Sequence, residues 1–344
     1  MSKANERELE ARLKYRSRLL IAALLLLLIV TAVLALCTGK YPLKPLVALS
    51  ILLGKTDVND VMAYSVVWGL RLPRITAAIV CGAALAMSGT AYQGIFKNPL
   101  VSSEFLGVSQ GACVGAAIAI LLHATNAQIQ LFAFLGGLLA VALTLLIPAL
   151  LRNNSNLMLV LSGIIIGGAL SSVLGFVKYI ADPETELAAI TYWQMGSFTY
   201  VTGKQLASVF LPMVLAALCL FGLAWRIDIL SLGETEAQTL GTNVPLVRLL
   251  TVLCATLLTA SSVCIAGTIS WVGLVIPHFG RMLVGTGNTR LLPTACISGA
   301  LFMLVVDTVA RTITAAELPI SILTGLIGAP LYAWLLYKQR MIIN

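Results

Sequence analysis

The residues of this chain that could carry catalytic chemistry do not complete a catalytic motif. Residues 54–56 (Gly-Lys-Thr) match the end of the phosphate-binding loop GxxxxGK[ST], but Leu49 occupies the position of its first glycine and no strand precedes it. The two histidines, His123 and His278, are far apart, and the chain has neither HExxH nor GxSxG. The sequence therefore predicts no catalytic, cofactor or metal site in this chain.

Charged residues in apolar segments are the next candidates. Asp307 is the only acid well inside an expected membrane span, and it precedes Arg311 by four residues, which favours a helical ion pair over a proton relay. Arg71 and Arg74 flank Pro73, where a helix is expected to begin, so their charges oppose its dipole. Either they reach lipid headgroups, or they form a docking site for an acidic partner outside the membrane.

The elements that position these side chains are expected to be membrane-spanning helices. Hydrophobic residues make up 59% of the 344 positions and charged residues 10%, whereas soluble domains have about a quarter charged residues. A spanning helix needs roughly 20 apolar residues, and ten such segments are expected, at 19–37, 72–92, 105–123, 128–151, 157–179, 206–225, 246–268, 272–285, 291–313 and 319–337. The predicted fold class is an all-α polytopic membrane protein.

Lysine and arginine set the expected orientation, because loops on the cytoplasmic side are enriched in both. With the N-terminus inside, 14 of the 22 basic residues fall on the inner side and 8 on the outer side. An even number of spans agrees with both termini being cytoplasmic. Residues 1–18 then form a cytoplasmic tail, 19–338 a single transmembrane domain, and 180–205 an outer segment.

The longest inner loop, residues 226–245, is expected to form short helices. Ser231 and Glu234 have the spacing of a capping box, and Gly241 can end the helix. This helix either lies on the membrane surface or inserts into a groove of a cytoplasmic partner. Its expected apolar stripe consists of Leu232, Ala237 and Leu240.

Several blocks of sequence resemble the permease family of iron-siderophore, haem and vitamin B12 ABC importers. In the first half they are 71–74 (RLPR), 82–89 (GAALAMSG), Gln93, 98–100 (NPL), 106–107 (LG) and 111–112 (GA). In the second half they are 230–233 (LSLG), Ala237, 240–241 (LG), Gly267, 271–274 (WVGL), 277–278 (PH), Arg281, 317–319 (ELP), 323–325 (LTG) and 328–330 (GAP). They follow the family order over residues 19 to 338.

The resemblance implies a fold of ten helices in two inverted-topology halves, with the pathway at the interface of two permease subunits. It implies a homodimer, two cytoplasmic ATPase subunits that hold the ATP and Mg, and a periplasmic substrate-binding protein. No nucleic acid is implied. The location implied is the bacterial inner membrane.

The resemblance also assigns roles to residues that match the family's motifs. It implies binding-protein docking by Arg71, Arg74 and Arg311, with Asp307 orienting Arg311. It implies coupling to the ATPase by Leu232, Gly233, Glu234, Ala237, Leu240 and Gly241. It implies pathway or gate positions at Gln93, Asn98, Asn153, Asn154, Ser162, Gly163, Gly167 and Ser171, although small residues in the fifth span equally favour close helix packing.

The expected function is therefore that of a non-catalytic permease subunit of an ATP-driven importer. The expected cargo is a ferric siderophore or a related iron chelate, haem or cobalamin, delivered by a binding protein. A stand-alone, ion-coupled secondary carrier is the alternative, and a non-transporting membrane scaffold or receptor is a third.

Overall fold

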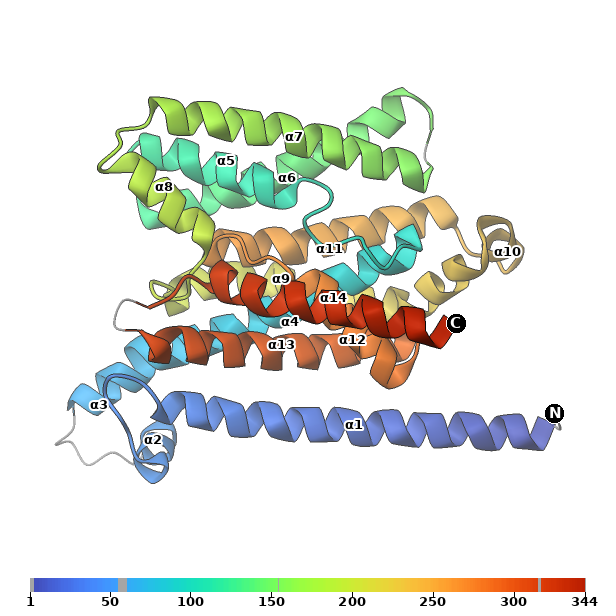
Figure 1. Ribbon diagram of the computed structural model, residues 1–344, viewed down its shortest axis with the longest axis horizontal. Coiled ribbons are helices and arrows are strands. Elements are labelled where there is room, and N and C mark those ends of the chain that lie inside the picture. Colours follow the sequence, from blue (N-terminus) through green and yellow to red (C-terminus); the bar gives the residue numbers. More distant parts are fainter. Residues whose placement is uncertain (1–2, 55–60, 154, 315–316, 344) are drawn as a thin grey trace.

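The computed structural model describes residues 3–54, 61–153, 155–314 and 317–343, and all regular structure in these ranges is helical (Figure 1). The first half of the chain forms α1 (Lys3–Cys37), α2 (Pro45–Leu52), α3 (Val61–Ser65), η1 (Val66–Arg71), α4 (Leu72–Phe96), α5 (Val108–Leu121), α6 (Asn126–Leu150) and α7 (Asn156–Ile180). The second half forms α8 (Glu186–Met195), α9 (Gly203–Leu232), α10 (Glu234–Thr239), α11 (Val244–Ala266), α12 (Val272–Val284), α13 (Asn288–Ile313) and α14 (Ile320–Ile343).

Each of the ten predicted spans lies on one of these helices. Seven helical stretches in the described residues are long and apolar enough to cross a membrane, and shorter apolar helices lie at Val108–Leu121, Val272–Val284 and Ile320–Trp334. The second predicted span, 72–92, was too short, because the helical stretch runs from Val61 to Phe96 through the π-helical turn η1. The all-α polytopic membrane fold is confirmed.

The two ends of the molecule carry different features (Figure 1). The N-terminus, the C-terminus and α10 lie at one end, called here the terminal end. The helices α2, α3 and α8 lie at the other end, called here the α8 end. Helix α8 lies within the predicted outer segment, residues 180–205.

The two halves have inverted topology. Helix α4 runs toward the terminal end, whereas its counterpart α11 runs away from it (Figure 1). Each is followed by a non-helical segment and then by a short helix, α5 or α12. Both short helices follow a residue with positive φ, Gly107 at +79° and Trp271 at +74°. The break in each half therefore occurs at the corresponding place.

Small residues let the long helices approach closely. A Cβ atom added at Gly82 of α4 would lie 2.3 Å from the carbonyl oxygen of Gly299 in α13. A Cβ atom added at Gly111 of α5 would likewise lie 2.3 Å from the carbonyl oxygen of Gly136 in α6. Without a hydrophobic force between helices in lipid, such backbone contact supplies much of the packing energy.

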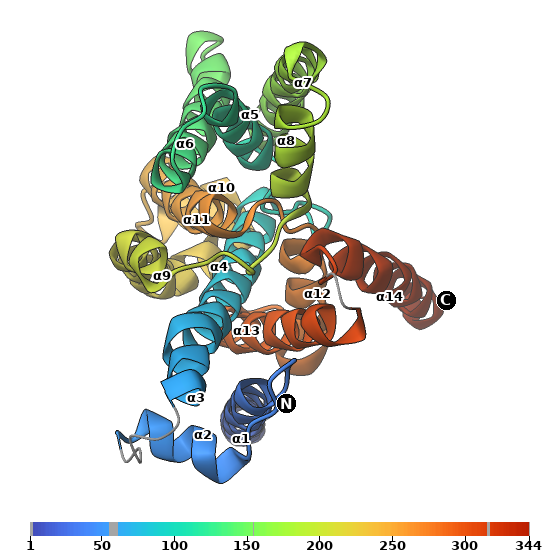
Figure 2. The ribbon, with the colours of Figure 1, turned by 90° about the vertical axis from the view of Figure 1, so that its left-hand side faces the viewer.

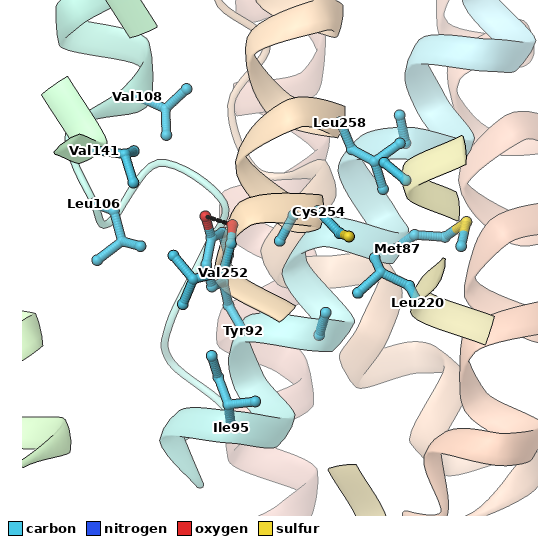
Figure 3. Packing of buried hydrophobic residues seen from close by; sticks show 14 of the residues in the cluster. Met87, Tyr92, Ile95, Leu106, Val108, Val141, Leu220, Val252, Cys254 and Leu258 are labelled. Carbon is cyan, nitrogen blue, oxygen red and sulfur yellow. Dashed lines mark hydrogen bonds between the residues drawn. The ribbon is translucent and has the colours of Figure 1, made fainter. Parts of the chain in front are cut away.

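A buried core joins the two halves around α4, α9 and α11 (Figure 3). Met87 of α4, Leu220 of α9 and Leu258 of α11 converge there. The Tyr92 hydroxyl, fully buried, donates to the Val252 carbonyl at 3.5 Å (Figure 3), so this polar atom keeps a partner away from water.

Local residue choice starts several of these helices. Ser155 caps α7 by accepting from the Met158 N–H at 3.3 Å, and Asn243 caps α11 by accepting from Leu246 at 3.1 Å. Thr202 and Gln205 form a capping box at α9. These side chains satisfy N–H groups that the helix itself leaves free.

Candidate functional sites

A cluster of charged side chains joins α4, α13 and the segment before α14 at the α8 end. Arg74 Nε donates to both carboxylate oxygens of Asp307, at 2.9 and 3.1 Å, and Arg74 Nη1 lies 2.8 Å from Glu317 Oε2. The Thr199 hydroxyl donates to the same Glu317 oxygen at 2.6 Å. Burial alone would raise the pKa of the Glu317 carboxyl, but the bonds from Thr199 and Arg74 outweigh burial and lower that pKa.

The other two arginines of the cluster hold the C-terminal end of α1. Arg71 donates to the carbonyl oxygens of Leu36 and Tyr41, and Arg311 donates to that of Ala35. Carbonyls at a helix C-terminus lack helical partners and carry partial negative charge, so cations there are favourable. The expectation that Arg71 and Arg74 oppose the dipole of a new helix was wrong, because the helical stretch begins at Val61.

The cluster changes two expectations from the sequence. The carboxylate of Asp307 is hydrogen-bonded to Arg74, from a different helix, and not to Arg311 as the spacing of four suggested. The structure brings the three predicted docking residues together, but their side chains point inward: Arg71 is 6% exposed, Arg311 8% and the Arg74 side chain 11%. Since three guanidinium groups face two carboxylates here, these five side chains carry one positive charge in excess. Their docking role stays a prediction.

A cavity of about 600 Å³ opens beside this cluster. Its wall includes Lys40, Gln130, Trp193 and Glu317, so Glu317 belongs both to the cluster and to the cavity. A molecule that entered the cavity could therefore compete with Arg74 for Glu317.

The predicted coupling loop forms a helix at the terminal end, with a different start from the one expected. Ser231 lies inside α9 and donates to the Asp228 carbonyl, so it caps nothing, and α10 starts after Gly233. Gly233 has φ +150°, a backbone conformation that favours glycine, whereas the atom nearest to a Cβ built there is the end of the flexible Glu236 side chain. Gly241, with φ +76°, ends the helix as predicted.

The side chains of this loop divide into a buried and an exposed set. Ala237 is fully buried, so its place in an exposed stripe was wrong. Leu232 is 66% exposed and Leu240 59% exposed. Glu234 pairs with Arg248 of α11 at 2.5 Å, which ties α10 to the following membrane helix. Two large apolar side chains therefore flank α10, a short helix that an ion pair ties to the bundle.

Two predicted gate residues lie at the same end. Gln93 is buried, donates to the carbonyls of Val101 (3.0 Å) and Gly273 (3.3 Å), and accepts from Arg281. Asn98 accepts from the Leu100 N–H at 2.9 Å and is exposed. Both line a cavity of about 800 Å³ whose wall also includes Leu232. The structure thus places gate and coupling residues around one space.

The residues predicted on and before α7 fall on two faces. Ser162 is fully buried and donates to the Met158 carbonyl at 2.7 Å, and a Cβ at Gly163 would lie 2.3 Å from the Phe105 carbonyl oxygen. Gly167 is half-buried, whereas Ser171 is exposed. The buried face packs closely, and the exposed face is open to a partner or a pathway.

The predicted gate residues of the α6–α7 connection are only partly placed. Asn153 accepts from the Ser155 N–H at 3.2 Å, whereas Asn154 lies outside the described residues. The neighbouring Asn156 donates to the Ile95 carbonyl at 3.1 Å, which links this connection to the end of α4.

One acidic residue was missed from the sequence. Glu104 precedes the expected span 105–123 and so was placed outside it, but the structure puts it, half-buried, in the segment between α4 and α5, with Ser270 next to its carboxylate. The signal available was Gly107, the left-handed residue after which α5 begins.

These features define a class of protein: a multi-pass helical membrane protein with a short helix outside the bundle at one end and no catalytic motif in its sequence. Residues 26–338 match the FecCD transport family, and the chain belongs to that family. It is 41% identical to the molybdate import system permease MolB of Haemophilus influenzae, over 92% of this chain and 95% of MolB.

A second relative and a solved structure agree with this assignment. An iron chelatin transport system permease of Helicobacter pylori is 40% identical over 79% of this chain and 82% of its own length. A solved inward-facing structure of a metal-chelate type ABC transporter superposes with a TM-score of 0.84 at 41% identity, covering 93% of this chain and 99% of that one. The chain is an ABC importer permease, a transport component and not an enzyme. Permeases of this family typically pair with an ATPase and a substrate-binding protein.

Proposed function

We propose that this chain forms the membrane channel of an inner-membrane importer for an iron chelate, with both termini in the cytoplasm. Two copies form the pathway, two ATPase subunits bind the terminal end, and a periplasmic binding protein delivers cargo to the α8 end. ATP and Mg belong to the ATPase subunits. The alternating opening of the pathway follows from movement of α10.

The observation that carries this proposal is α10 with the two exposed leucines that flank it, Leu232 at the end of α9 and Leu240 just after α10. Leu232 and Leu240 lie outside the bundle at the terminal end, where an apolar surface in water is unfavourable unless a partner covers it. The Glu234–Arg248 pair fixes α10 to α11, so a force on α10 reaches a helix that crosses the bundle core. An ATPase groove supplies the partner that this geometry needs.

Co-purification tests the proposal. Burial of a leucine at an interface contributes about 1.5–3 kcal/mol, so Leu240→Asp is expected to reduce the ATPase subunit retained with the permease about 10-fold or more. Leu46→Asp is the matched control, because Leu46 is a leucine of the α8 end that is even more accessible (82% exposed) than Leu240. Equal retention by both variants would refute the assignment of α10.

The docking role of the arginine cluster supports delivery at the α8 end. An acidic binding protein would meet the excess positive charge there and could compete with Asp307 and Glu317 for Arg74. Reversal of Arg71 and Arg74 to Glu is expected to weaken capture of the binding protein; because it also places carboxylates beside Asp307, Glu317 and the carbonyls of α1, capture is compared per folded, assembled transporter. Glu317→Gln, which leaves Arg74 with Asp307 as its carboxylate partner, is expected to strengthen capture. Unchanged capture in both variants at physiological salt contradicts docking at this cluster.

The cargo is proposed as a ferric siderophore or a related chelate, with haem and cobalamin as further members of the same class. The names of the relatives support iron chelates and also molybdate. Uptake of labelled ferric chelate, haem, cobalamin and molybdate by the reconstituted complex with its own binding protein decides among them. Uptake driven by a proton gradient without any ATPase would instead establish the secondary carrier.

A further inference from the structure

Two non-helical segments meet inside the helix bundle. Residues 97–107 connect α4 to α5, and residues 267–271 connect α11 to α12. A Cβ atom at Gly273, just after the second segment, would lie 2.7 Å from Ser103 Oγ in the first. The corresponding breaks of the two inverted halves are therefore in direct contact.

Glu104 lies at this contact, near the middle of the length of α7. A Cβ atom built on Gly163 would lie 2.3 Å from the carbonyl oxygen of the neighbouring Phe105. A Cβ atom built on Gly107 would lie 3.5 Å from the backbone nitrogen of Gly167. Gly167 is near the midpoint of α7, which crosses the whole bundle (Figure 1). A carboxyl group at this depth is costly unless it faces protein or a water-filled space.

The side chains of Glu104 and Ser270 are both half-buried in the single chain, so part of each is accessible from outside it. Viewed along the helices from the α8 end, the loop of residues 97–107 lies between α8 and α14 (Figure 2). Helices α7 and α14 keep exposed faces, which include Ser171 of α7.

We propose that Glu104 is a selectivity residue of the transport pathway, where its charge favours neutral and cationic metal chelates over oxyanions and anionic chelates. The inference rests on the proposed importer function and narrows its cargo class. Ser270 lies next to the carboxylate, and α5 and α12 begin at Val108 and Val272, just after the two segments, so the partial positive charge of both helix N-termini offsets part of the cost of burying a negative charge here.

Lys178 is a positively charged side chain whose position relative to Glu104 affects the same pathway. Its ammonium group donates to Gln194 Oε1 of α8, so it is held toward the α8 end, and Cys113 of α5 lies within electrostatic range of both Lys178 and Glu104. Cargo entering from the α8 end therefore passes a tethered positive charge before the negative charge at the centre.

Charged thiol reagents test the local potential without any cargo. Ser270→Cys in a background lacking the seven native cysteines places a reporter beside Glu104. In the reconstituted complex with its ATPase, a cationic trimethylammonium methanethiosulfonate is expected to react faster than its anionic sulfonate counterpart. Glu104→Gln, which keeps the shape and can still accept from Ser270, is expected to lower that rate ratio by on the order of 10-fold.

The matched control is Glu184→Gln, which removes an exposed carboxylate after α7 and is expected to leave the ratio unchanged. The proposal is overturned if Ser270→Cys does not react with either reagent, if Glu104→Gln leaves the ratio unchanged, or if Glu184→Gln changes it equally.

Uptake measures the consequence for cargo. Rates for a neutral ferric trihydroxamate and an anionic ferric tris-catecholate are each divided by the wild-type rate, which cancels the preference of the binding protein. Glu104→Gln is expected to raise this relative uptake rate of the anionic chelate about 10-fold above that of the neutral chelate. Equal changes in the two relative rates contradict selectivity by Glu104. If the wild-type complex shows no ATP-dependent uptake at all, the proposed function fails, and the labelling ratio alone then decides whether Glu104 lines a water-filled space.

Discussion

Removing the charge of Asp307 probes the cluster at the α8 end most directly. Asp307 is fully buried, and its carboxylate holds Arg74 through Nε and Nη2. Breaking a buried ion pair by removing one partner costs about 3–5 kcal/mol, because the other charge stays buried without compensation. In Asp307→Asn, Arg74 keeps Glu317 at 2.8 Å, so the lower end, about 3 kcal/mol, is expected.

Thermal unfolding of the purified permease, followed by tryptophan fluorescence, measures this loss. At about 2–4 °C per kcal/mol, Asp307→Asn is expected to lower the unfolding midpoint by roughly 6–12 °C. Glu184→Gln, an exposed carboxylate without this pairing, is expected to stay within about 0.5 kcal/mol of the wild type.

A double substitution separates the ion pair from general damage. Arg74→Met combined with Asp307→Leu removes both charges and keeps apolar volume, so most of the lost stability is expected to return. If Asp307→Asn unfolds at the wild-type temperature, the pair does not stabilise the fold. If the double variant is less stable than Asp307→Asn, the charges matter through other contacts than the one between them.

Two further predictions follow from the same structure. The pKa of Glu317 is lowered in the folded chain, so the stabilisation from its carboxylate is complete above its unfolded pKa of about 4.3 and is lost as pH falls through the folded value. The difference in unfolding midpoint between wild type and Glu317→Gln is therefore expected to shrink as pH falls below about 4. A difference that does not change with pH contradicts the assignment. Gly299→Ala places a Cβ atom 2.4 Å from the Gly82 carbonyl oxygen, whereas a Cβ at Gly222 would have no atom within 4 Å. Gly299→Ala is therefore expected to destabilise the fold by about 1–3 kcal/mol, and Gly222→Ala is not. Equal unfolding midpoints for the two variants contradict the close approach of α4 and α13.

Composition and periodicity were sufficient for the architecture. Long apolar segments in a chain with 10% charged residues have no stable alternative to membrane helices, and each expected segment is found on a helix. The family motifs were sufficient for the class of function, because their order along the chain reflects the whole fold. Local turn chemistry was less reliable: the end of α10 at Gly241 was correct, but its start was misplaced by the apparent capping pair at Ser231 and Glu234.

The partners of buried charges required the tertiary structure. The sequence placed Asp307 beside Arg311 because helix neighbours can be read from spacing, whereas the actual partner Arg74 is 233 residues away. Glu104 looked peripheral because spans read from hydropathy are treated as continuous, and only the contact between the two non-helical segments brings it to the centre of the bundle. Hydropathy is a property of each segment alone and so determined that this protein is a polytopic membrane protein. The pairing of charges depends on which segments meet in space, and that was decided by the packing of the two inverted halves.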